Sequence, residues 1–64
     1  MNTGDRVYTP RFCTVRISAI FDRPQEAAEA GFTAPTFYRD PAGVFGVSGK
    51  SLDMYHMEFA AYRK

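Results

Sequence analysis

Polar and apolar residues alternate along the chain between positions 13 and 21. The odd-numbered positions of this segment are apolar: Cys13, Val15, Ile17, Ala19 and Phe21. The interleaved positions 14, 16 and 18 are polar. A period of two in a segment rich in β-branched residues is typical of a strand with one face on a core and one in water. We therefore predict a strand over 13–21 whose odd-numbered side chains form the floor of the core.

A shorter strand is expected just before it, over residues 6–9, with Val7 pointing inward. Pro10 has no backbone N–H to donate and should end this strand. Arg11 and Phe12 lead directly into the long strand, so the two strands are predicted to pair as neighbours.

A two-turn helix is predicted between Asp22 and Gly31. Asp22 is a suitable N-cap, and Gln25 stands at the capping-box spacing. Gly31 is placed to end the helix in a left-handed conformation, which would bring Phe32 back to Ala27 in a Schellman motif. A helix this short is not stable alone, so it must pack on the sheet.

Residues 36–47 have the pattern of a hairpin. A strand over 36–39 precedes the sequence Asp-Pro-Ala-Gly at 40–43, which favours a type I turn, and a strand over 44–47 follows. Gly46 indicates a bulge or a close approach of another group. We expect residues 48–53 to form a loop.

The C-terminal segment 54–64 fits two structures. As a strand it places Met57, Phe59 and Ala61 on one face. As a helix it gives one apolar stripe: Leu52, Tyr55, Phe59 and Tyr62. We favour the strand, because a small open sheet needs a further strand at its edge.

These elements predict one α+β domain over residues 4–64. The expected fold is a small, mainly antiparallel sheet of four to five strands with one short helix inserted between the second and third strands. Its predicted core consists of Val7, Cys13, Val15, Ile17, Ala19, Phe21, Ala27, Phe32, Phe37, Val47 and Phe59. The alternative is a small SH3-like barrel, because Gly4-Asp5-Arg6-Val7 is similar to the first strand of many such barrels.

Composition narrows the functional classes. The 64 residues include six phenylalanines and four tyrosines, so exposed aromatic surface and self-association are expected. The single cysteine excludes an internal disulfide. A net charge of +1 predicts no general attraction to nucleic acid or acidic lipid. No apolar run approaches membrane-spanning length, so we expect a cytoplasmic protein with no membrane association.

No motif for catalysis or metal binding emerges. Gly49-Lys50-Ser51 lacks the glycine that a phosphate-binding loop requires at position 44, which is valine. His56 is the only histidine, and with Asp53 and Glu58 it forms no known ligand set. We therefore expect no enzyme activity, no metal site and no cofactor.

Several short segments together resemble a protein family. They are Ala30-Gly31-Phe32-Thr33, Tyr38-Arg39-Asp40, Gly49-Lys50-Ser51-Leu52 and Met57-Glu58-Phe59-Ala60-Ala61. Over residues 4–64 the chain resembles small uncharacterised accessory proteins of bacterial conjugative and other mobile elements. The resemblance implies a bacterial, cytoplasmic setting and supplies no catalytic residue.

The leading functional hypothesis is a non-catalytic protein-interaction or accessory module. Its expected surface comprises Tyr38, Arg39, Lys50, Tyr55 and His56, because exposed aromatics near glycine-flanked loops suit recognition. The partner would be an unidentified protein or a second copy of the chain in a homodimer.

The alternative hypothesis is single-stranded nucleic-acid binding. Aromatics interleaved with cations on a sheet hold single strands by stacking and phosphate contacts. The candidate cations are Arg11, Arg16, Arg39 and Lys50. The candidate aromatics, expected to be exposed among them, are Tyr8, Phe12 and Tyr38.

Overall fold

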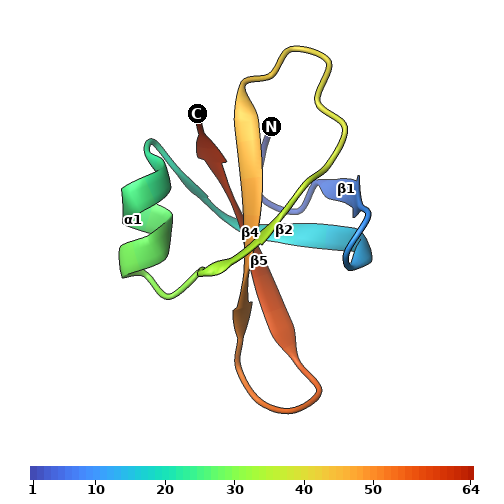
Figure 1. The fold of residues 1–64 in the computed structure, drawn as a ribbon, viewed down its shortest axis with the longest axis vertical. Coiled ribbons are helices and arrows are strands. Elements are labelled where there is room, and N and C mark those ends of the chain that lie inside the picture. Colours follow the sequence, from blue (N-terminus) through green and yellow to red (C-terminus); the bar gives the residue numbers. More distant parts are fainter.

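The computed structural model describes residues 1–64 and has a small α+β fold, with five strands and one short helix. In chain order the elements are β1 (Arg6–Thr9), β2 (Cys13–Phe21), α1 (Pro24–Glu29), β3 (Ala34–Thr36), β4 (Phe45–Ser51) and β5 (Met57–Arg63). The strands form one sheet in the order β1-β2-β5-β4-β3. The sheet curls strongly, and α1 packs against its outer side (Figure 1).

The last strand forms the centre of the sheet. The prediction of a strand in the C-terminal segment is confirmed, but its expected place at an edge is wrong. β5 lies between β2, to which it is parallel, and β4, to which it is antiparallel. Parallel neighbours need a crossover, which α1 and the β3–β4 hairpin together supply. Ala60 and Ala61 are both fully buried in β5, because the sheet is covered on both faces there.

β2 spans the residues predicted for it, but its side chains do not keep to one face. The register against β5 shifts between Ile17 and Ala19. An extra residue in a strand sends the following side chains to the opposite face. Val15 and Ile17 therefore point into the curl of the sheet, whereas Ala19 and Phe21 pack on the helix side. Ile20 joins the inner cluster, which explains why an apolar residue interrupts the alternation.

The core consequently has two parts. The larger cluster fills the curl of the sheet and contains Val15, Ile17, Val47, Phe59 and Ala61. The smaller cluster lies under the helix and contains Ala27, Phe32 and Ala60. β5 contributes to both in alternation, so it ties the two parts together.

The predicted end of the helix is confirmed. Gly31 has φ 97°, and its N–H donates to the Ala28 carbonyl at 3.0 Å. The Phe32 N–H donates to the Ala27 carbonyl at 2.9 Å. These are the two hydrogen bonds of a Schellman motif.

The predicted start of the helix is wrong by one residue. Arg23, not Asp22, is the N-cap, and no side chain caps the helix. Pro24 is the first helical residue, and a residue before proline is forced into extended backbone. Arg23 accordingly has φ −139° and ψ 150°. Instead of accepting from the first turn, Asp22 donates its N–H to the Glu26 carboxylate at 3.3 Å.

Cys13 is not part of the core, contrary to prediction. It is exposed and has φ 61° at the tight return from β1 to β2. The buried Thr9 side chain orders this return, because its Oγ1 donates to the Cys13 carbonyl and accepts from the Phe12 N–H, each at 3.0 Å. The turn geometry therefore rotates the first side chain of β2 away from the inner face.

In the β3–β4 hairpin, the paired residues begin further from the turn at 40–43 than predicted. β3 ends at Thr36, and Phe37, placed in the predicted core, is 80% exposed. The turn at residues 40–43 is confirmed, since the Gly43 N–H donates to the Asp40 carbonyl at 3.0 Å. The Asp40 carboxylate also accepts from the amides at 44 and 45, both at 2.8 Å. These bonds hold residues 37–44 as a loop.

β4 extends through residues 48–51, where a loop was expected. Seven residues of β4 pair with β5, from Phe45 opposite Arg63 to Ser51 opposite Met57. Glycines at 46 and 49 lower strand propensity, but each is covered by a β5 side chain, Tyr62 and Phe59 respectively. The long antiparallel partner overrides the local preference of the sequence.

Candidate functional site

The five residues predicted to form one surface lie at two separate places. Tyr38 and Arg39 belong to the loop 37–44, whereas Tyr55 and His56 belong to the turn of the β4–β5 hairpin. Figure 1 shows these two loops extending from opposite ends of β4. The structure therefore does not bring the predicted set together, and Lys50 lies toward the hairpin end.

Tyr38 has a structural role. Its ring packs against the inner core cluster, so it is half-buried. Burial, and then the negative charge of Asp40, raise the pKa of Tyr38 to about 12. The neutral phenol is thus strongly favoured, and most of the side chain is not available to a partner.

Lys50 packs over the end of the helix. Its Nζ lies 5.7 Å from the centroid of the Phe32 ring, which places a cation over an aromatic face. Its aliphatic part covers Gly31, where no Cβ interferes. The half-buried lysine thus helps to fix the Schellman turn.

The hairpin turn at residues 52–56, named here the tip loop, carries the most exposed apolar surface. Leu52 is 52% exposed, and Met54 and Tyr55 are each 85% exposed. Sequence reasoning identified Tyr55 but missed Leu52 and Met54. The available signal was three large apolar residues within four positions, where the predicted loop 48–53 meets the predicted strand from 54.

Asp53 organises the tip loop from within. Its Oδ1 accepts from the Tyr55 N–H at 2.8 Å and from the His56 N–H at 3.0 Å. The same carboxylate lies 2.9 Å from the His56 Nδ1, forming the only ion pair of the structure when the imidazole is charged. The Leu52 N–H closes the loop by donating to the His56 carbonyl at 3.0 Å. The exposed apolar side chains therefore project from a held backbone.

The order of the tip loop should depend on pH. Hydrogen bonds from the Tyr55 N–H and then from the His56 ring lower the pKa of Asp53 from its usual 3.8. Because the folded pKa is depressed, the stabilisation is complete above the usual value and is lost as pH falls through the folded pKa. We expect the NMR signals of the Tyr55 and His56 amides to move together over this acidic range. An Asp53→Asn variant retains an acceptor oxygen but no titrating charge, so persistence of the transition in it would contradict this assignment.

The residues proposed for nucleic-acid binding do not form one face either. Phe12 packs edge-on against Phe59 in the core, with ring centroids 5.2 Å apart. Arg11 lies over the Phe12 ring and donates to the Pro35 carbonyl at 3.3 Å, linking the first hairpin to β3. Arg11 and Phe12 are thus part of the closure of the curled sheet.

Comparisons with known proteins add no family to this description. Neither family models, nor curated proteins, nor solved structures gave a match to the chain.

The structure contains no pocket and no group of three or more side chains suited to hold a metal ion. None of its helical segments has the length and apolar character needed to cross a membrane. The tip loop is therefore the candidate functional site on geometric grounds.

Proposed function

We propose that the protein is a non-catalytic interaction module whose tip loop binds a partner protein. The observation that supports this is the exposure of Leu52, Met54 and Tyr55 on a turn whose backbone is fixed by Asp53. Large apolar and aromatic side chains dominate the energetics of protein interfaces. A turn that is already ordered loses less conformational entropy on binding.

The proposed setting is a bacterial cytoplasm, with the protein acting as an accessory factor of a mobile element. The resemblance of residues 4–64 to such accessory proteins supports this setting. The partner is either another protein of that element or a second copy of the chain. The tip loop suits both, because it protrudes at one end of the molecule (Figure 1).

The proposal is tested by affinity capture with three baits followed by binding measurements on purified partners. The baits are the wild type, a tip variant with serine at positions 52, 54 and 55, and Phe37→Ser. Phe37 is a matched control because it is nearly as exposed as Met54 and Tyr55 but lies in the other loop. We expect proteins enriched by the wild type and Phe37→Ser to be lost with the tip variant. Titration calorimetry of the purified partner should show at least about tenfold weaker binding by Tyr55→Ser.

A second variant tests whether the fixed backbone of the tip loop contributes to binding separately from the apolar side chains. Asp53→Ala leaves all three apolar side chains in place but removes the acceptor for two backbone amides. We expect weaker binding to the same partner with unchanged circular dichroism of the sheet.

Light scattering identifies the homodimer case, in which the wild type is dimeric and the tip variant monomeric. Equal capture of every protein by wild type and tip variant, with no dimer, would contradict the proposal.

A further inference from the structure

We propose a second binding surface on the outer face of the β1–β2 hairpin, which holds single-stranded nucleic acid through Arg6, Arg16 and Tyr8. This surface is independent of the tip loop. It differs from the arginine and aromatic set suggested by the sequence, because Arg6 enters it while Arg11 and Phe12 are committed to the fold.

The two arginines are direct cross-strand neighbours. β1 and β2 are antiparallel, and their register places Arg6 opposite Arg16. Side chains at such positions have Cβ atoms about 4.5–5.5 Å apart, and like charges there are destabilising. Both residues are exposed, whereas Val7 and Val15 on the other face pack in or against the core. The hairpin thus presents two positive charges side by side to solvent.

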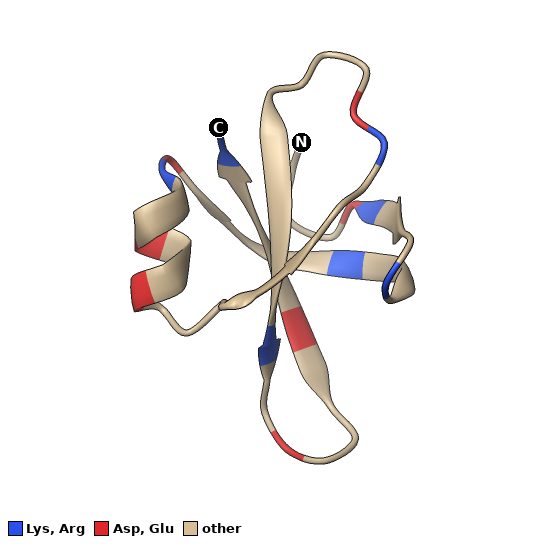
Figure 2. Cartoon of the chain, viewed as in Figure 1, with Lys and Arg blue, Asp and Glu red and all other residues tan.

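Neither arginine forms an ion pair in the structure. Asp5, next to Arg6 in sequence, accepts instead from the Asn2 N–H at 2.8 Å. Glu58 of β5 precedes Phe59, which pairs in parallel with Ile17, so the register places Glu58 beside Arg16. Its other cross-strand neighbour is Lys50, so this one carboxylate stands between two cations and does not offset both arginines. Figure 2 shows the basic segments of β1, β2 and their turn on one side of the molecule, with one acidic segment beside the start of β1. An anion between the two guanidinium groups would relieve their repulsion and form charge-assisted hydrogen bonds.

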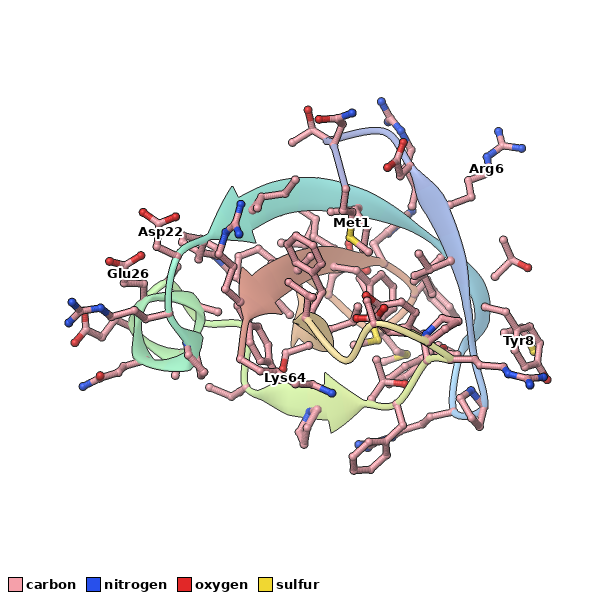
Figure 3. The ribbon with its side chains drawn as sticks, turned by 90° about the horizontal axis from the view of Figure 1, so that it is seen from above. Met1, Arg6, Tyr8, Asp22, Glu26 and Lys64 are labelled. Atoms are coloured by element: carbon pink, nitrogen blue, oxygen red, sulfur yellow. The ribbon has the colours of Figure 1, made fainter.

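An uncovered aromatic ring completes the surface. Tyr8 is 64% exposed and stands two residues after Arg6 on the same strand face. Its cross-strand neighbour is Thr14, which is too small to cover the ring. Figure 3 shows Arg6 and Tyr8 both projecting outward from β1. In a single strand, the ring would stack on a base while the two cations contact the neighbouring phosphates. A compact anion such as inorganic phosphate would use the cations but not the ring.

The test is fluorescence anisotropy with a labelled oligothymidylate of about 12 nucleotides, which is within the range that small sheet domains contact. Wild-type binding should weaken with salt, with a slope of log K against log [salt] of about −1.4 for two phosphate contacts. Arg6→Gln and Arg16→Gln should each reduce that slope by about half. Tyr8→Ala should weaken binding at least about fivefold with little change in slope.

Controls separate a site from overall charge. An Arg23→Gln/Lys64→Gln double variant has the same net charge as Arg6→Gln/Arg16→Gln but changes residues away from the hairpin, and it should bind as the wild type does. Heparin carries negative charge but has no bases, so it reports on binding of anions in general. Tyr8→Ala should weaken binding of the oligonucleotide but not binding of heparin. Thermal melts should show that the hairpin variants fold, since removing a like-charge pair costs no packing. Absence of binding at low salt, equal weakening by both double variants, or no effect of Tyr8→Ala on the oligonucleotide would each overturn the proposal.

Discussion

Replacement of Ile17 by alanine is expected to unfold most of the protein under physiological conditions. Ile17 is fully buried at the centre of the inner cluster, where β2 passes beside β5. Truncation of a buried isoleucine costs about 2–5 kcal/mol, through lost transfer free energy and the cavity left behind. A single core in a chain below about 70 residues rarely supplies more than about 3–5 kcal/mol. The expected loss therefore approaches the whole stability of the fold.

Urea denaturation followed by circular dichroism measures this effect, with two controls from the same strand. Ile17→Val keeps most of the volume and should cost only about 0.5–1.5 kcal/mol. Ile20→Ala removes the same atoms from a half-buried position beyond the bulge, so it should cost less than Ile17→Ala. Equal urea midpoints for Ile17→Ala and Ile20→Ala would show that the bulge does not divide the strand as described.

Replacement of Gly46 by alanine is expected to destabilise the fold by about 1–3 kcal/mol through overpacking. A Cβ at this position would lie 2.6 Å from Cε2 and 2.9 Å from Cζ of the Tyr62 ring. The ring cannot move freely, because its hydroxyl accepts a hydrogen bond from the Ser48 Oγ at 3.1 Å and its body packs against the helix-side cluster. Either the strands separate locally or Tyr62 leaves its place.

A double-mutant cycle with Tyr62→Leu tests this cause. Leucine retains apolar packing but has no atoms where the outer part of the tyrosine ring lies. We expect Gly46→Ala to cost at least about 1 kcal/mol less in the Tyr62→Leu background, measured from urea midpoints. Ser48→Ala alone gives the contribution of the hydrogen bond. Strict additivity of the two substitutions would mean that the cost comes from the backbone of β4 and not from the ring.

The candidate site was predictable only in part. The tip loop was included through Tyr55 and His56, because aromatic residues near turn signals indicate recognition surfaces. Grouping them with Tyr38 and Arg39 failed, since the seven-residue β4 separates the two loops. The organising role of Asp53 was also missed, although its hydrogen bonds reach only two and three residues along the chain and aspartate is a common turn former. Arg6 and Arg16 became neighbours through strand register, which residue types alone do not reveal.

The sequence alone determined several secondary-structure elements and turns, because these depend on interactions between residues close together in the chain. Alternation over residues 13–21, the glycine that ends the helix, and the aspartate-proline turn at 40–43 each depend on neighbours within a few positions. Tertiary structure decided the rest. The central place of β5 and the bulge that sends Ala19 and Phe21 to the helix depend on partners far along the chain. Burial and strand pairing stabilise the fold only when distant segments come together. Their free energy outweighs the small local preference of each residue for helix or strand.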